Sequence, residues 1–175
     1  MKIISILLIT ILLTSCSGNN MKPIDFKDQK PRLIIEDYLS GNIKAWGILQ
    51  NRSGKVTRQF SAELNGKWDG KQLILDEKFN WSDGEIQKRQ WQINKIDQHN
   101  YEGTAGDVVG TAKGYSYGPT FKFEYVLLVP IKGKNIKITF DDWIFQQDDK
   151  VAINKATMTK FGIKVAELTV LFLKD

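Results

Sequence analysis

The sequence predicts an all-β protein, an antiparallel barrel of roughly nine or ten strands with a short helix before it. From Ile43 onward, runs of about 6 to 13 residues rich in aromatic and β-branched side chains alternate with turn signals. The turns recur at regular intervals, as is typical of hairpins that close into a barrel or sandwich. No long helical periodicity separates the runs, which argues against a doubly wound α/β fold.

Length and composition indicate one domain with a sizeable core. The chain has 175 residues, of which 42% are hydrophobic and 11% aromatic. The net charge is +5, but lysine and arginine are scattered rather than clustered. This pattern argues against a nucleic-acid-binding surface.

The first residues have the features of a secretory signal. Met1 and Lys2 give a positive start, and residues 3–13 form an apolar run broken only by one serine and one threonine. The run is too short for a membrane-spanning helix but suits a signal-peptide core. Leu13-Thr14-Ser15-Cys16 resembles the bacterial lipobox. We therefore expect a lipoprotein signal peptide over residues 1–15 and lipid attachment at Cys16; the alternative is an ordinary signal peptide with a chance cysteine.

This interpretation implies a cellular address. Ser17 after the lipidated cysteine implies transfer to the outer membrane, so we expect a lipid-anchored domain facing the periplasm. Several acyl chains would form a stable anchor. Cys16 is the single cysteine of the chain, so the mature domain has no disulfide, zinc ribbon or catalytic thiol. A periplasmic address also argues against a nucleic-acid or ATP-dependent role.

The remaining elements follow in order. Residues 16–30 are polar and are expected to form a lipidated tether. Residues 31–175 would be the barrel domain. It begins with a short helix between Pro31 and Gly41, because proline suits the first helical turn and glycine the end. Leu33, Ile34 and Tyr38 of this helix would cover one end of the domain.

Alternation along the strands predicts which residues face inward. Phe121, Phe123, Tyr125 and Leu127 form an unbroken inner stripe. The other expected inner apolar residues are Val56, Phe60, Ala62, Leu64, Leu73, Leu75, Phe79, Trp81, Trp91, Ile93, Ile136, Ile138, Phe140 and Ile144.

Four charged residues fall on the same inner faces: Arg58, Glu77, Arg89 and Asp142. A buried charge costs several kcal/mol, in order of magnitude, unless it is paired. One interpretation is an internal network of ion pairs that fixes the barrel. The other is a polar cavity in which an arginine meets a ligand carboxylate or phosphate.

The sequence offers no catalytic or metal constellation. Asp141 and Asp142 are adjacent in an expected strand, so they point to opposite faces. Asp148-Asp149 is typical of a hairpin turn. The single histidine, His99, lies in a polar turn, which argues against a serine triad or a histidine metal site. No catalytic residue, metal or cofactor is therefore predicted.

The glycine-rich stretch from Glu102 to Gly114 lacks both phosphate-loop patterns. Either it forms two strands of small residues where the barrel bends, or its missing side chains leave room for a ligand.

Several segments resemble a proteobacterial lipoprotein family known only as a domain of unknown function. The most specific are W-D-G…L-D-E-x-F, D-G-E…R-x-W and D-D-W…D…N…K-F-G, and the resemblance extends from about Leu39 to Phe172. The family pattern has matching residues at Arg58, Glu77, Arg89, Trp91, Asp141, Asp142, Trp143, Asn154 and Lys160. It departs at Lys155, where the family tends to have arginine, and at Ala166, where it tends to have glycine.

The resemblance implies a lipocalin-like (calycin) barrel but no assigned activity. Our first hypothesis is a carrier of a lipid or other amphiphile that serves envelope lipid maintenance. The ligand would contact the residues Arg58, Glu77, Arg89, Trp91, Tyr125, Asp142 and Asn154. The second is a structural or assembly-factor lipoprotein with a filled barrel and a protein partner. The third is a lipid-modifying enzyme with Asp142 or Glu77 as acid or base.

Overall fold

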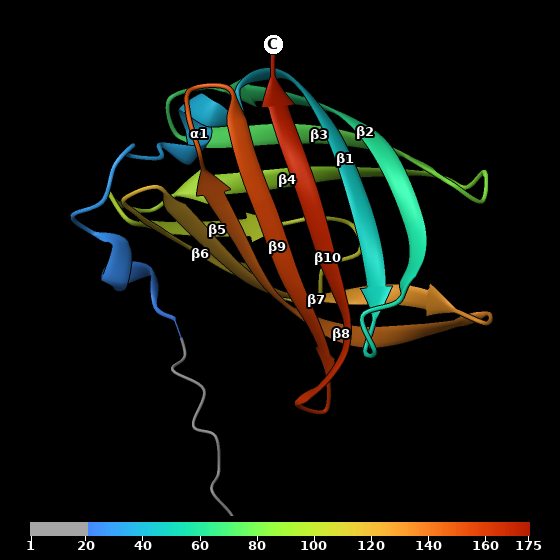
Figure 1. Cartoon of the computed structure of the whole chain (residues 1–175). Helices are drawn as coiled ribbons and strands as arrows, with labels where there is room; N and C mark the ends of the chain where they lie inside the picture. The colour runs from blue at the N-terminus through green and yellow to red at the C-terminus, as the bar shows by residue number, and fades with distance from the viewer. Residues whose placement is uncertain (1–20) are drawn as a thin grey trace, which may run out of the picture.

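Ten antiparallel strands close into one barrel in the computed structural model, which describes residues 21–175 (Figure 1). The predicted all-β barrel class is confirmed, with a single turn of α-helix before the first strand. The expected signal peptide, Cys16 and the first residues of the expected tether lie outside the described residues. Among those described, no helix is long and apolar enough to cross a membrane.

Each strand pairs with its neighbours along the chain, and the first pairs with the last. The register runs from Ile43 opposite Lys174 to Asn51 opposite Ala166, which closes the barrel. The elements are η1 (Pro23–Phe26), α1 (Ile35–Tyr38), β1 (Gly41–Asn51), β2 (Val56–Trp68), β3 (Gln72–Trp81), β4 (Ile86–Lys95), β5 (Asn100–Thr104), β6 (Ala112–Tyr117), β7 (Thr120–Ile131), β8 (Lys134–Gln146), β9 (Val151–Lys160) and β10 (Ile163–Lys174).

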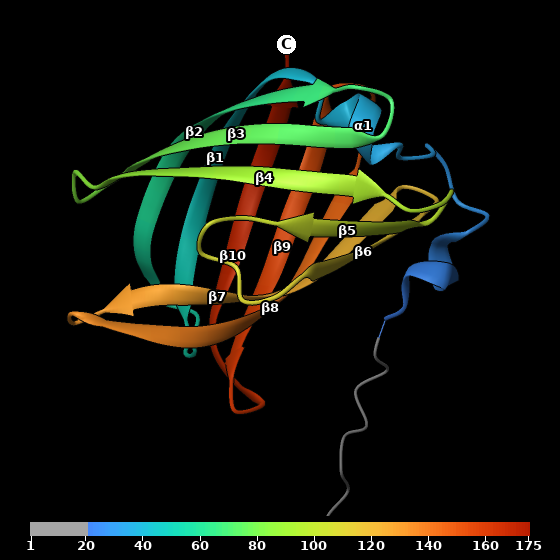
Figure 2. The same ribbon diagram turned by 180° about the vertical axis from the view of Figure 1, so that it is seen from behind.

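This up-and-down order sorts the turns between two ends of the barrel. We call the end covered by α1 the helix end; it carries the turns after β2, β4, β6 and β8 (Figures 1 and 2). The opposite end, which we call the far end, carries the turns after β1, β3, β5, β7 and β9.

Helix α1 plugs the helix end. Ile35 and Tyr38 are buried, whereas Ile34 is 40% exposed and takes no part in the plug. The helix begins later than Pro31, because the Leu33 N–H donates to the Gly118 carbonyl at 2.8 Å and keeps this segment extended.

A buried carboxylate fastens the plug to the wall. Glu36 is buried and accepts hydrogen bonds from Lys95 and, at 2.8 Å, from the Tyr101 hydroxyl. Burial opposes ionisation of Glu36, but these hydrogen bonds outweigh it and lower its pKa. The plug is therefore held by an ionised, fully engaged carboxylate.

The described part of the expected tether lies against the outside of the barrel. The Phe26 ring packs 6.1 Å from Trp143 and 6.0 Å from Phe145, measured between ring centroids. Trp143 and Phe145 flank the inner residue Ile144, so alternation puts them on the outer face, and this contact covers them. Trp143 is consequently only 6% exposed.

The interior is filled largely by the predicted aromatic stripe. Phe121 and Phe123 are buried, and the glycines opposite them give them room. A Cβ atom on Gly103 would lie 2.5 Å from the Phe123 ring, and one on Gly114 would lie 2.8 Å from Phe121. The small residues of the glycine-rich stretch thus accommodate the protein's own phenylalanines.

One part of the wall is thin. Strand β4 pairs with β5 only from Gln92 onward, and β6 pairs with β7 only up to Glu124. The β5–β6 loop, residues 105–111, crosses the gap and is tied to β7 by the bridge between Val108 and Leu127 (Figure 2).

Candidate functional site

The barrel encloses a cavity of about 100 Å³. Alternation places one polar or aromatic side chain from each of several strands on its lining. Six of the seven residues expected at a ligand site line it together: Glu77, Arg89, Trp91, Tyr125, Asp142 and Asn154. Their role in binding stays a prediction.

Arg89 is the cation of this cavity. Its guanidinium binds the Asp107 carboxylate in bidentate geometry: Nη2 lies 2.7 Å from Oδ2, and Nε lies 3.0 Å from Oδ1. Its Nη1 also lies 3.6 Å from Oε2 of Glu77. The Arg89 side chain is 14% exposed, so these charges meet in a largely desolvated place.

Glu77 is poorly satisfied in comparison. The 3.6 Å contact is an ion pair but too long for a hydrogen bond, and Glu77 Oε2 is buried with no hydrogen-bond partner among the described residues. Burial raises the pKa of Glu77 to about 7; Arg89 opposes the rise, while Asp142 and Asp107 add to it. The titration of this carboxyl is therefore moved close to neutral pH.

Asp142 is held by neutral donors. The Tyr125 hydroxyl donates to Oδ2 at 2.9 Å, and the Asn154 amide donates to Oδ1. Asn154 also donates to the Trp143 carbonyl at 3.1 Å, which fixes its orientation. Burial raises the pKa of Asp142 despite these hydrogen bonds. Burial, followed by the charge of Asp142, raises the pKa of Tyr125 well above its ordinary value.

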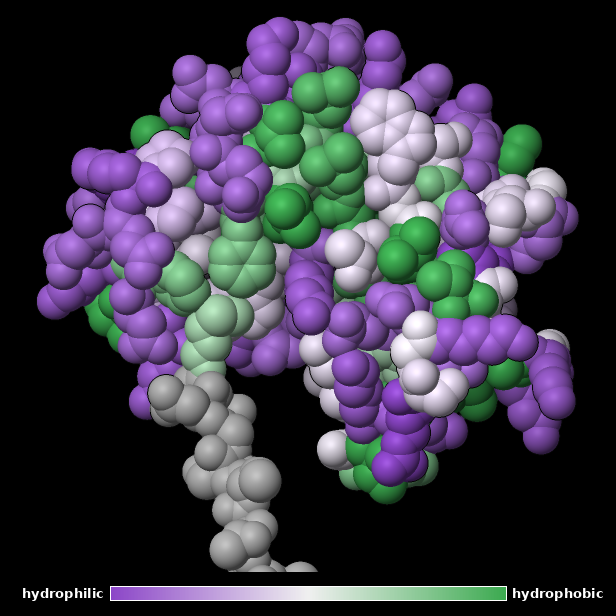
Figure 3. Space-filling view, viewed as in Figure 1, coloured by the Kyte–Doolittle hydropathy of each residue, from purple (hydrophilic) through white to green (hydrophobic). Residues whose placement is uncertain are grey.

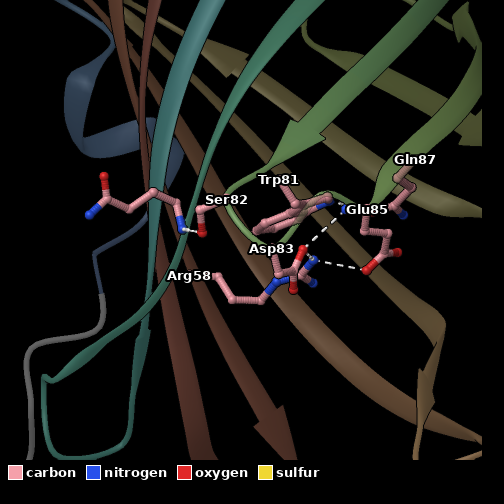
Figure 4. A network of polar contacts seen from close by, with 7 residues as sticks. Arg58, Trp81, Ser82, Asp83, Glu85 and Gln87 are labelled. Carbon is pink, nitrogen blue, oxygen red and sulfur yellow. Dashed lines mark hydrogen bonds and ion pairs between the residues drawn. The ribbon is translucent and has the colours of Figure 1, made fainter.

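Arg58 lies apart from this cavity, although it was expected to join the other inner charges. Figure 4 shows its guanidinium between Asp83 and Glu85 of the β3–β4 turn, at 2.7 and 2.8 Å. The same group lies 4.0 Å from the centre of the Trp81 ring. Because Arg58 lies close to the start of β2, at the far end, the carboxylates of the neighbouring β3–β4 turn pair with it in place of Glu77 or Asp142. Arg58 is thus a turn-fastening residue.

A second space lies on the outer side of Arg89. A groove of about 690 Å³ follows the thin part of the wall between β4 and the β7–β8 hairpin. Arg89 lines both the groove and the interior cavity, and Asp107 lines the groove. The Arg89–Asp107 pair therefore stands at the boundary between the two spaces.

Asp107 is the site residue that the sequence analysis missed. It lies in a loop, where no alternation assigns a face, and its partner is 18 positions away. The charge count gave no signal for it, because Glu77 and Asp142 already balanced the two arginines expected inside. The other aspartates lie as predicted: Asp141 accepts a hydrogen bond from Trp143 on the outer face, and Asp148 accepts from backbone N–H groups in its turn.

The site combines one arginine with three carboxyl groups, those of Glu77, Asp107 and Asp142. Burial raises the pKa of Glu77 to about 7 and raises the pKa of Asp142 above its ordinary value, so both carboxyl groups are harder to ionise here than in water. Within the described residues, no group of three His, Cys, Asp or Glu side chains is placed to hold a metal ion. The described groups are a buried guanidinium paired with Asp107 and a carboxyl, that of Glu77, whose pKa lies at about 7.

Fold and site together define a closed antiparallel β-barrel with a charged interior. Comparison with known families makes the assignment specific. Residues 10–174 match the family described as protein of unknown function DUF3833, and the chain belongs to this family. No curated protein matches the chain.

Solved structures with the same fold share little sequence with it. The S-type phycobiliprotein lyase CPES from Guillardia theta is 7% identical with a TM-score of 0.60, over 80% of this chain and 90% of that one. Rv2717c from M. tuberculosis is 13% identical with a TM-score of 0.60, over 85% and 99%. A DUF3598-family protein of unknown function from Nostoc punctiforme is 12% identical with a TM-score of 0.62, over 84% and 51%. At such identities the likeness concerns the fold alone.

Proposed function

We propose that this protein is an outer-membrane lipoprotein whose periplasmic barrel binds an acidic amphiphile, such as a fatty acid or anionic lipid. The observation that carries the proposal is Arg89, a largely buried arginine held in bidentate geometry by a carboxylate of the protein's own loop. A buried guanidinium fork of this kind matches the geometry of a carboxylate or phosphate.

In the proposal, Asp107 occupies the place of the ligand's acidic group when the site is empty. A ligand carboxylate that replaced it would keep Arg89 paired, so the exchange leaves no buried cation unpaired. Asp107, released, lies at the edge of an open groove and can be hydrated there. Glu77 would adjust to the incoming charge by taking up a proton, as its pKa of about 7 allows.

The small volume of the interior cavity limits which part of a ligand can enter it. Pockets for drug-sized ligands measure roughly 300–1,000 Å³, whereas the interior cavity measures about 100 Å³. The cavity as it stands accepts a head group but no acyl chain. Movement of the β5–β6 loop away from Arg89 would join it to the groove of about 690 Å³, and the tail would then lie along the thin wall.

The anchoring part of the proposal rests on the N-terminal sequence. The apolar run of residues 3–13 and the lipobox-like Leu13-Thr14-Ser15-Cys16 favour lipidation at Cys16. Attachment to a membrane would place the barrel beside a source of amphiphiles, in keeping with a role in envelope lipid maintenance. The fold is shared with a phycobiliprotein lyase, so barrels of this shape are compatible with functions other than scaffolding.

Trp91 supplies the test, because it lines the cavity beside Arg89. The full chain is titrated with a fatty acid brominated next to its carboxyl group, below its micelle concentration, and tryptophan fluorescence is recorded. We expect saturable quenching that is lost in Trp91→Phe and in Arg89→Met but kept in Arg58→Met. The brominated alcohol of equal length is the ligand control. Equal quenching by acid and alcohol, or none by either, would contradict the proposal.

A filled barrel acting as a structural or assembly-factor lipoprotein is the second candidate. The cavity of about 100 Å³ favours it, since aromatic side chains occupy most of the interior. In that case the buried charges serve stability alone, and no amphiphile quenches Trp91.

An enzyme that uses Glu77 as general acid or base is the third candidate. The observation in its favour is the pKa of about 7, which suits proton transfer at neutral pH. The enclosed cavity offers little room for a substrate until the loop moves. Turnover of a bound acyl ester that is lost in Glu77→Gln would establish this candidate over simple binding.

A further inference from the structure

The far end of the barrel carries an aromatic side chain that folding does not explain. Phe161 forms the tip of the β9–β10 turn and is 93% exposed. Its φ is +51°, in the left-handed region that side chains other than those of Asn and Asp rarely adopt. Two-residue hairpin turns of this shape favour Asn-Gly, whereas this chain has Phe161-Gly162. Neither burial nor turn geometry accounts for phenylalanine here.

Exposed aliphatic side chains surround the same end. We call three turns of the far end the rim: residues 51–56 after β1, 131–134 after β7 and 160–165 after β9. Asn51 pairs with Ala166, which brings the first and third of these turns side by side. The exposed aliphatic residues of the rim are Ile163 (55%), Ile131 (45%), Val56 (40%) and Val165 (36%). Figure 3 shows hydrophobic side chains among hydrophilic ones at the lowest point of this face, where the β9–β10 turn lies in Figure 1.

The charges of the rim have one sign. Its three segments contain Arg52, Lys55, Lys132, Lys134, Lys160 and Lys164, and no aspartate or glutamate. Glu167, just beyond the rim, pairs with Lys164 at 2.6 Å. The β3–β4 turn lies on the same side of the barrel as the β7–β8 turn and away from the β9–β10 turn in both ribbon views (Figures 1 and 2). Its acids, Asp83 and Glu85, are paired with Arg58.

The helix end has the opposite character. Its turns carry Asp69, Asp97, Asp148 and Asp149 against Lys71 and Lys150. The first three aspartates accept backbone N–H groups within their own turns. The barrel is thus polarised, with an apolar and basic rim at one end and acidic turns at the other.

We infer that the rim is a docking surface for an anionic lipid bilayer. Exposed phenylalanine and aliphatic side chains that project from hairpin tips, ringed by lysine and arginine, suit the boundary between head groups and acyl chains. The basic residues meet the negative surface potential of anionic lipids, and the attraction weakens within about 10 Å at 0.1 M salt. Docking by the rim would turn the far end toward the membrane. This inference does not rest on ligand binding inside the barrel.

A fluorescent label at chosen positions tests the orientation. In full-length chain carrying Cys16→Ser, one environment-sensitive thiol label is placed by Ser53→Cys on the rim, by Gln98→Cys at the helix end, or by Ile153→Cys on the outer wall, where Ile153 is 39% exposed. Each chain is mixed with phosphatidylglycerol vesicles or with phosphatidylcholine vesicles. We expect only the label at position 53 to shift to the blue and resist aqueous iodide, with anionic vesicles and at low salt.

Phe161→Asn is the decisive variant. Asparagine tolerates the left-handed backbone better than phenylalanine, so the barrel should fold at least as well. The substitution removes an aromatic side chain that the docked protein would bury in the bilayer. It should therefore shift the equilibrium between docked and undocked protein roughly tenfold or more toward the undocked form. Protection at position 98 or 153 in place of 53 would overturn the inference. So would protection at 53 that needs no vesicles and rises with protein concentration, because the rim would then join two copies of the chain.

Discussion

Arg89 of β4 and Asp107 of the β5–β6 loop form a bidentate ion pair where the barrel wall is thinnest, with the shortest contact at 2.7 Å. The pair closes the wall between the interior cavity and the outer groove. It satisfies a buried cation with a residue from an irregular loop. The loop is thus held on two sides, by Arg89 at the cavity and by β7, where the Leu128 N–H donates to the Asp107 carbonyl at 2.8 Å and the Val109 N–H donates to the Val126 carbonyl at 2.8 Å.

Arg89→Met should destabilise the barrel far more than Arg58→Met. Removing Arg89 leaves Glu77 and Asp107 without their cation, and breaking a buried pair costs about 3–5 kcal/mol. Arg58 is paired with two half-exposed carboxylates in a turn, so its loss should cost about 1 kcal/mol. Urea unfolding of both variants of the full chain measures the difference. Equal decreases in the free energy of unfolding would mean that the buried Arg89–Asp107 pair stabilises the barrel no more than the exposed pairs of Arg58 do.

Glu77→Gln should flatten the dependence of stability on pH. The folded pKa of Glu77, about 7, is raised above the unfolded value near 4.5, so the folded state binds more protons between these values. The stabilisation from Glu77 is therefore present below about pH 4.5 and is lost as pH rises through about 7. The loss amounts to at most about 3 kcal/mol.

The measurement is the free energy of unfolding of wild type and Glu77→Gln at pH 5 and pH 8. From pH 5 to pH 8, the free energy of unfolding of the wild type should fall relative to that of Glu77→Gln. Parallel changes in both proteins would show that Glu77 titrates normally.

Tyr125→Phe should destabilise the protein by about 1–3 kcal/mol at neutral pH, because it removes a donor from the buried Asp142 carboxylate. The loss should shrink in acid, where Asp142 is protonated and needs the donor less. Tyr115→Phe, on the outer face of β6, is the matched control and should change stability little. An equal effect of the two substitutions at neutral pH would argue against the Asp142 network.

Gly103→Ala should destabilise the barrel while Gly106→Ala should not. The new methyl group at position 103 would lie 2.5 Å from the Phe123 ring, and overpacking of this kind costs about 1–3 kcal/mol. At position 106 a Cβ meets nothing within 4 Å. Thermal unfolding of both variants checks the contrast, and equal midpoints would mean that Phe123 can move aside freely.

The sequence predicted the regular parts of this molecule well. Alternation with period two assigned Glu77, Arg89 and Asp142 to the interior, because a strand side chain has only two directions. It could not tell how far along the barrel each one lies. For this reason it grouped Arg58 with them, whereas the closed sheet places Arg58 beside the β3–β4 turn.

Alternation along strands could not predict the side-chain directions of irregular segments. Asp107 sits in a loop, where no periodicity fixes a direction, and its pairing depends on how the short strands β5 and β6 leave the wall open. The volume of the interior was equally unpredictable, because it depends on how Phe121 and Phe123 fit over Gly103 and Gly114.

In the proposed function an acidic ligand and Asp107 compete for Arg89, and the affinity of a fatty acid for three forms of the full chain measures this competition. Asp107→Asn removes the competing charge, so it should bind the fatty acid roughly tenfold or more tightly than wild type. Arg89→Met should abolish binding. Unchanged affinity in Asp107→Asn, or retained affinity in Arg89→Met, would contradict the account.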